Sequence, residues 1–157
     1  MTEPVLAFVH TVAANIETFD ALVSEIAPDV PVRHVVHGGL LKKALTAGEL
    51  TPDIRRRTAE AVLRETEDGA AAVVLCTCST VGPGADDAAE MTTTKVMRVD
   101  RPMAENAVRM GKRIAVAATV TTTLGPTLDL LSEAAAKAGK EIDLVPVVFA
   151  EAGAKLM

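Results

Sequence analysis

The chain has 157 residues, of which 49% are hydrophobic, so it can bury an ordinary core in one compact domain or two small lobes. It has three phenylalanines, no tryptophan and no tyrosine, and its formal net charge is -5. This composition argues against nucleic acid as a partner, because phosphates attract clustered lysine and arginine. The apolar stretch near the N-terminus is too short for a signal or a membrane span, so we expect a cytoplasmic protein with no membrane partner.

Short runs of valine, isoleucine and leucine alternate with helical patterns along the chain. This alternation predicts βα units, and therefore an α/β fold built on a mainly parallel sheet. The predicted strands are Val5–His10, Val32–Val36, Ala71–Cys76, Val96–Val99, Ile114–Ala118 and Ile142–Val148.

Two amphipathic helices are predicted in the first half of the chain. The segment Asn15–Ile26 opens with an asparagine cap and carries Ile, Phe, Leu and Val at helical spacing. The segment Thr51–Gly69 opens with a threonine cap and a proline at the first helical position, and its glycine is expected to close the helix.

Three shorter helices are predicted further along the chain. The first covers Asp86–Met91, after a glycine-rich loop, and the second runs from a cap at Asp100 to Met110. The third begins at Ala150 and runs to Met157. Because a new βα series starts after the second of these helices, we expect one lobe over residues 1–100 and another over residues 101–157.

Three turns that follow predicted strands are rich in small hydroxyl residues. They are His10–Ala14, Cys76–Thr80 and Thr119–Thr123. Ligands of an open parallel sheet bind beyond the carboxyl ends of its strands, so the amides and hydroxyls of these turns could hold a carboxylate. For any one turn alone, the alternative is an ordinary helix cap.

The chain has two cysteines, Cys76 and Cys78. A strand would hold both side chains on one face, about 7 Å apart along the chain, and such a pair is no disulfide framework. Cys78 falls where the buried strand gives way to the turn, so backbone dipoles could stabilise its thiolate. The alternative for Cys78 is an inert buried thiol, and the position of Cys76 is more typical of a core residue.

Three other chemistries find no match in the sequence. A phosphate loop of the Cys-x5-Arg type fails, because the residues six positions after the cysteines are Gly82 and Gly84. The histidines His10, His34 and His37 lack the spacing of a zinc site, and we assign the last two to strand and turn packing. A nucleotide-binding glycine fingerprint is also missing.

Three motifs, in order, resemble the aspartate/glutamate/hydantoin racemase superfamily. The segment Thr77–Gly82 is similar to its Thr-Cys-Ser-Ser/Thr-x-Gly motif, and Val99–Glu105 to its Ile-Asp-x-Pro-Met-Ala-Glu motif. The segment Ala118–Thr127 resembles its Ala-Thr-x-x-Thr-Thr-Leu-x-Pro-Thr stretch. The superfamily includes amino-acid and hydantoin racemases, arylmalonate decarboxylases and maleate isomerases, so the resemblance indicates the fold more strongly than the reaction.

The resemblance implies two pseudo-symmetric, flavodoxin-like α/β lobes with a site between them. It implies a small carboxylate substrate, a homodimer, and neither a metal nor pyridoxal phosphate nor a nucleotide as cofactor. The implied catalytic thiol is Cys78, with Cys76 as a second candidate. The implied substrate-binding residues are Thr11, Ser79, Thr80, Thr119 and Thr122.

A racemase that uses two bases needs one acid-base group on each face of the planar carbanion. Two cysteines on one strand cannot supply both, and in the family the opposing residue comes from a later strand of the second lobe. The sequence reaches Met157 before such a strand, so we expect an incomplete second lobe. The expected function is a cofactor-independent amino-acid racemase for aspartate, glutamate or a related carboxylate. The alternatives are a one-cysteine decarboxylase or isomerase of the same superfamily, or a truncated, noncatalytic carboxylate-binding module.

Overall fold

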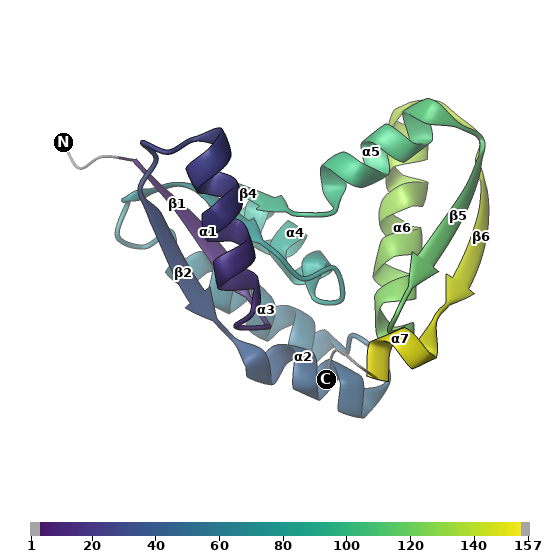
Figure 1. The fold of residues 1–157 in the computed structure, drawn as a ribbon, viewed down its shortest axis with the longest axis horizontal. Coiled ribbons are helices and arrows are strands. Elements are labelled where there is room, and N and C mark those ends of the chain that lie inside the picture. Colours follow the sequence, from purple (N-terminus) through teal and green to yellow (C-terminus); the bar gives the residue numbers. More distant parts are fainter. Residues whose placement is uncertain (1–3, 155–157) are drawn as a thin grey trace. The chain divides into compact units, whose positions relative to one another are not determined.

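The computed structural model describes residues 4–154, and the chain divides into two compact units, Met1–Arg98 and Val99–Met157 (Figure 1). Each unit has its own hydrophobic core and its own parallel strands. Within residues 4–154, no helix is both long enough and apolar enough to cross a membrane.

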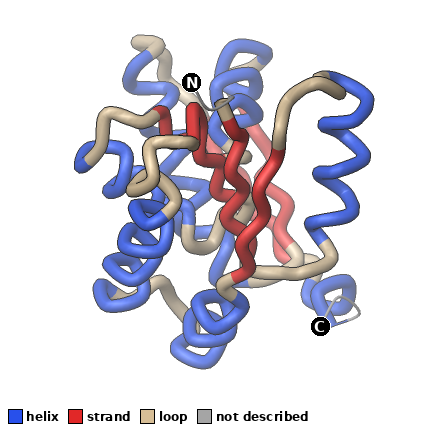
Figure 2. The backbone as a smooth tube through the Cα atoms, turned by 90° about the vertical axis from the view of Figure 1, so that its left-hand side faces the viewer, coloured by secondary structure: helices blue, strands red, loops and turns tan. Residues whose placement is uncertain are grey.

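The first unit is built on a four-stranded sheet in the order β2-β1-β3-β4, with every neighbouring pair parallel. Figure 2 distinguishes the strands (red) from the helices that pack around them (blue). Its strands are β1 (Val5–His10), β2 (Val32–Val36), β3 (Ala71–Cys76) and β4 (Lys95–Arg98). The predicted parallel α/β architecture is therefore confirmed. Three of these strands have the predicted bounds, and β4 lies one residue earlier than predicted.

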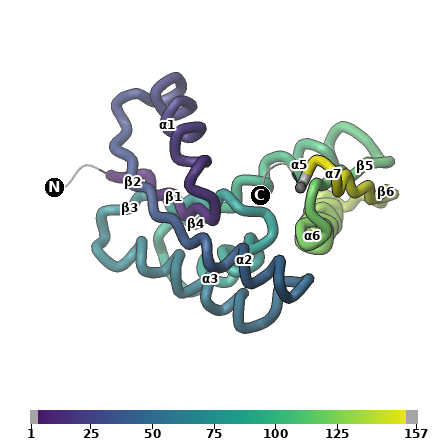
Figure 3. The backbone as a smooth tube through the Cα atoms, turned by 60° about the horizontal axis from the view of Figure 1, so that its bottom comes forward, coloured from purple at the N-terminus to yellow at the C-terminus, as the bar shows by residue number. Residues whose placement is uncertain are grey.

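The helices of this unit cover two different faces of the sheet (Figure 3). They are α1 (Asn15–Ile26), α2 (Gly38–Ala47), α3 (Pro52–Arg64) and α4 (Gly82–Met91). Successive side chains of a strand point to opposite faces, and the central strand β1 divides its residues accordingly. Ala7 and Val9 join the aliphatic core with α2, α3 and α4, while Phe8 and His10 pack against the tilted ring of Phe19 in α1.

The second helix of the chain, α2, was not predicted, and α3 ends at Arg64 instead of continuing to Gly69. Residues 65–67 continue as turns closed by bonds of the i to i-3 type. Arg33 of β2 binds the residue that follows the helix. Its guanidinium donates to the backbone carbonyl of Glu65 at 2.9 Å and pairs with the Glu65 carboxylate at 3.0 Å. Gly69 instead closes the following turn, with a φ of 66°.

The start of α1 also differs from the prediction. Ala14 occupies the N-cap position without a side-chain cap, and Asn15 is the first helical residue. The Asn15 side chain is directed to Thr77 at the end of β3, with Nδ2 3.5 Å from Oγ1. The apolar stripe is covered at Phe19 but not at its far end, where Leu22 is 43% and Ile26 77% exposed.

The start of α4 lies upstream of the predicted Asp86, at Gly82. Pro83 sits in the first turn, where a missing amide hydrogen costs nothing, so the glycine-rich loop is itself helical. Gly84 then allows α4 to approach α3, because a Cβ at this position would lie 2.6 Å from Arg55 O and 2.6 Å from Thr58 Cβ.

The second unit pairs β5 (Arg113–Ala118) with β6 (Asp143–Val148) in parallel. Its helices are α5 (Arg101–Met110), α6 (Thr121–Lys137) and α7 (Ala150–Ala154). Asp100 stands at the predicted N-cap position of α5, although its side chain makes no cap hydrogen bond. The predicted last helix is present from Ala150, and residues 155–157 of that prediction lie outside the described residues.

The core of the second unit joins α5 and α6 to β5 through Val108, Val116, Leu130 and Leu131. The Lys140 ammonium donates to two backbone carbonyls at the end of α5, Val108 O at 3.0 Å and Arg109 O at 3.1 Å. A cation at this position satisfies carbonyls that have no partner within the helix and complements the helix dipole.

The close approach of α3 and α4 predicts a position-specific cost for an added methyl group. Gly84→Ala should lower the free energy of unfolding by about 1–3 kcal/mol, because the new Cβ overlaps the backbone of α3. Gly39→Ala in α2 is the matched control, since nothing lies within 4 Å of its Cβ position, and it should be neutral or stabilising by up to about 1 kcal/mol. Urea denaturation checks both variants, and equal effects would contradict the packing described.

Candidate functional site

The two cysteines lie at the end of β3 and in the turn that leads to α4. The strand ends at Cys76, so Cys78 lies in the turn, and the expectation that one strand face carries both thiols is wrong. Thr77 extends the ladder by one bond, because its amide donates to Val9 O of β1 at 3.1 Å. The turn then closes with Gly82 N donating to Ser79 O at 3.3 Å.

The two cysteines are free thiols that contact the same aliphatic core, but they differ in burial. Cys76 is 1% exposed and belongs to the aliphatic core beneath the sheet. Cys78 is half-buried, and its carbonyl lies 3.9 Å from the Cys76 Sγ. Solvent therefore reaches Cys78 more readily than Cys76.

The hydroxyl of Thr77, between the two cysteines, meets three polar groups. Its Oγ1 lies 2.7 Å from His10 Nδ1, 3.5 Å from Asn15 Nδ2 and 3.4 Å from Val9 O. The turn is thus held to β1 by its backbone and to both β1 and α1 by one side chain.

His10 continues this contact away from the turn. Its Nε2 lies 2.8 Å from His34 Nδ1, and His34 Nε2 lies 2.9 Å from the Asp20 carboxylate. The two imidazoles are nearly parallel, with ring centroids 5.1 Å apart and planes inclined by 12°. Burial, together with the His34 ring, lowers the pKa of His10 from its ordinary value of 6.5, and the Asp20 carboxylate acts in the opposite sense.

The sequence did not predict these contacts. The sequence predicts a packing role for His34 and no role for Asp20. Strand alternation places Phe8 and His10 on one face, but their partners depend on the strand register, which sets Phe8 opposite His34. The helical spacing of α1 does place Asp20 on the same face as Ile16 and Phe19, and this position on the apolar stripe is the signal that could have found it.

A buried arginine lies beneath the start of α4. Arg98, the last residue of β4, is 3% exposed, and its Nη1 is 2.9 Å from the Asp86 carboxylate. A Cβ at Gly82 would lie 2.5 Å from Arg98 Nε, so the guanidinium fills the space that a side chain would need. The glycine of the Thr-Cys-Ser-Thr-Val-Gly segment is therefore explained by the arginine under it.

The other predicted binding residues of the first unit follow β1 or β3, so they belong to the carboxyl edge of one sheet. Thr11 is 5% exposed, and its Oγ1 has no hydrogen-bond partner among residues 4–154. Thr80 is 2% exposed, and Ser79 is half-buried. Among these three hydroxyls, the Thr11 hydroxyl is the one without a hydrogen-bond partner in the described residues. Buried polar groups usually have a partner, which can be a ligand or a water molecule.

The second unit carries the remaining two predicted residues. Thr119 follows β5 and is half-buried, and Thr122 lies in the first turn of α6 with 8% of its surface exposed. The Thr122 Oγ1 also lacks a partner within the described part of the chain. That these residues bind a carboxylate, and that they approach the cysteine turn, stays a prediction.

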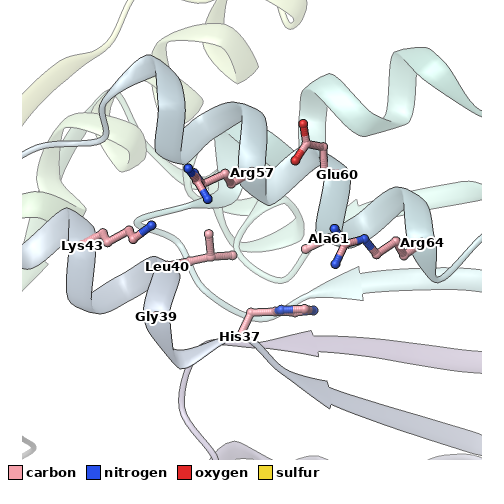
Figure 4. Close-up of a pocket in the computed structure, with 8 residues that line it drawn as sticks. All are labelled: His37, Gly39, Leu40, Lys43, Arg57, Glu60, Ala61 and Arg64. Atoms are coloured by element: carbon pink, nitrogen blue, oxygen red, sulfur yellow. The ribbon is translucent and has the colours of Figure 1, made fainter.

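A pocket of about 250 Å³ lies between α2 and α3 (Figure 4). It is lined by His37, Gly39, Leu40, Lys43, Arg57, Glu60, Ala61 and Arg64. None of the residues predicted for the site lines it, and Arg57 is already paired with Asp53 at 2.7 Å. In residues 4–154, no group of three or more His, Cys, Asp or Glu side chains is placed to hold a metal ion.

The structure is similar to that of glutamate racemase from Aquifex pyrophilus, with a TM-score of 0.68 and 15% sequence identity. The match covers 94% of this chain and 57% of that chain, so the chain spans little more than half the length of that enzyme. At this identity the comparison shows the fold alone, and it confirms the racemase-like α/β fold that the motifs predicted. No known family profile and no curated protein sequence matches the chain.

The contact between Gly82 and Arg98 predicts coupled effects on stability. Gly82→Ala should lower the free energy of unfolding by about 1–3 kcal/mol, because the methyl group displaces a buried, paired guanidinium. In an Arg98→Met background the same change should cost less, since the thioether side chain can move aside. Denaturation of the two single variants and the double variant tests this coupling, and strictly additive effects would contradict it.

The lowered pKa of His10 predicts a dependence of stability on pH. The unfolded chain binds this proton more readily than the folded chain, so the free energy of unfolding falls as the pH drops below 6.5. The slope contributed by His10 is at most about 1.4 kcal/mol per pH unit, until the lowered pKa is passed. Arginine-held carboxyls such as Asp68 and Asp87 titrate below their ordinary 3.8, outside this window.

Urea denaturation between pH 5 and 7.5 measures the effect, with His10→Gln as the comparison. The variant should show a flatter dependence of stability on pH than the wild type. Identical slopes in the two proteins would show that His10 is not responsible.

Proposed function

We propose that this chain provides a cofactor-independent, racemase-like site in which Cys78 transfers a proton at the carbon beside a carboxylate. The observation that carries the proposal is the half-buried Cys78 thiol, in the turn between β3 and α4 of a fold similar to that of glutamate racemase. The motif resemblance of Thr77–Gly82 to the aspartate/glutamate racemase superfamily supports the same assignment.

In the proposed reaction the Cys78 thiolate removes the α-proton of a bound carboxylic acid, and the electron pair moves toward the carboxylate. The resulting enediolate-like charge needs hydrogen-bond donors already in place. The beginning of α4 directs its helix dipole toward the end of the turn, and the orphan Thr11 hydroxyl lies at the same sheet edge. We assign carboxylate binding to Thr11, Ser79 and Thr80.

Cys76 is the less suitable thiol for this chemistry. It is 1% exposed in an aliphatic core, where a thiolate would be poorly solvated, and a reactive cysteine requires access to its substrate. The proposal therefore gives Cys76 a packing role and leaves proton transfer to Cys78.

Racemisation requires an acid-base group on each face of the carbanion. Cys76 and Cys78 come from one short segment and have unequal burial, so we do not assign the two faces to this pair. A decarboxylase or isomerase of the same superfamily is the second candidate, because a single thiol that donates one proton suffices for it. The small carboxylate substrate, the homodimer and the cytoplasmic location stay predictions.

The experiment is proton exchange at the α-carbon, followed by NMR in heavy water with aspartate, glutamate, a hydantoin and an arylmalonate. Wild type, Cys78→Ala and Cys76→Ala are compared, and circular dichroism verifies that each is folded. Exchange or decarboxylation should occur with one substrate class, disappear in Cys78→Ala and persist in Cys76→Ala.

Two results would overturn the proposal. Activity that survives in Cys78→Ala but is lost in folded Cys76→Ala would assign the chemistry to the other thiol. No turnover of any substrate by the folded wild-type chain would favour a noncatalytic carboxylate-binding module.

A further inference from the structure

We infer that Asp20, His34 and His10 form a directional hydrogen-bond chain that fixes the hydroxyl proton of Thr77, and that this chain positions the turn that carries Cys78. The three contacts measure 2.9, 2.8 and 2.7 Å in order from Asp20 to Thr77. The inference concerns residues that the proposed proton transfer does not use. Only its consequence for Cys78 rests on the proposed function.

The direction of the chain follows from its end. An ionised carboxylate can only accept hydrogen bonds, so His34 must donate from Nε2 to Asp20. In a neutral imidazole one nitrogen donates and the other accepts, which makes His34 Nδ1 the acceptor for His10 Nε2–H. His10 Nδ1 is then an acceptor as well, and the Thr77 hydroxyl donates to it.

Burial and stacking limit the alternatives. His10 is fully buried, and the His34 side chain is 11% exposed, whereas Asp20 is 49% exposed. Phe8 stacks on both imidazoles, with interplanar angles of 7° to His10 and 5° to His34. Phe8 therefore restricts the rotation of both imidazole rings. The Asp20 carboxylate is the group of the hydrogen-bond chain that is most exposed to solvent.

The orientation of the Thr77 hydroxyl has a consequence for the turn. When its proton points to His10, its lone pairs remain available to Asn15 Nδ2 at 3.5 Å. Protonation of His10 would place a hydrogen on Nδ1 as well, and the Thr77 proton would have to turn toward another acceptor such as Val9 O at 3.4 Å. The titratable groups that act on His10 are His34 from β2 and Asp20 from α1.

The test is the tautomeric state of the two histidines, read from ring-nitrogen chemical shifts in protein labelled with ¹⁵N-histidine. At pH 7.5 both rings should carry a proton on Nε2 and none on Nδ1, as the hydrogen-bond chain requires. Asp20→Ala should convert His34 and His10 to mixtures of tautomers. Glu17→Ala removes an exposed carboxylate from the same helix, and it should leave both rings unchanged.

A second pair of variants tests the other end of the chain. Thr77→Val removes the hydroxyl and should shift the His10 Nδ1 resonance, whereas Thr77→Ser should restore it. A His10 proton on Nδ1 in the wild type, or rings unaffected by Asp20→Ala, would overturn the inference. These spectra need no substrate, so failure of the chain and failure of the proposed proton transfer are distinguishable.

Activity provides the readout that links the chain to Cys78. If the wild type exchanges α-protons, the pH profile of that exchange should shift in Asp20→Ala and remain in place in Glu17→Ala. A profile that moves equally in both variants would contradict a positioning role for Asp20.

Discussion

The hydrogen-bonded end of the β1–β3 pair is the constraint on which the candidate site depends. The parallel register sets Val9 beside Cys76, and the Thr77 amide then donates to Val9 O at 3.1 Å. Because the strands are parallel, both carboxyl ends reach the same edge of the sheet. One register therefore brings His10, the Thr77 hydroxyl and the cysteine turn together.

Burial of polar groups distinguishes the two faces of this sheet. One face is aliphatic and contains Cys76, while the other holds His10, whose two ring nitrogens both have partners. Burying a polar group without a partner costs free energy, so a fully buried imidazole requires this arrangement. On the aliphatic side, the buried Arg98 guanidinium likewise has a partner, the Asp86 carboxylate. The guanidinium fits there because Gly82 has no side chain.

The strands and the fold class could be predicted, because compact apolar runs between turn residues have few other solutions in a chain of this length. The start and end points of the helices, and the burial of single polar side chains, were harder to predict. The helix α2 opens with two glycines, which are poor helix formers, and the residue after α3 is bound by Arg33 from a strand distant in the sequence. The burial of Arg98 could not be predicted, because arginine is seldom fully buried unless a tertiary partner is present.

The central proposal is that Cys78 is the accessible, reactive thiol, and alkylation of the native protein tests it most directly. Iodoacetamide modification at neutral pH, quantified for each cysteine by mass spectrometry with and without a dicarboxylate, separates the two thiols. We expect Cys78 to be modified in the folded protein, and a bound dicarboxylate to slow this reaction. Cys76 should react only when the chain unfolds. A Cys78 that reacts no faster than Cys76, or whose rate is indifferent to every dicarboxylate, would contradict the account.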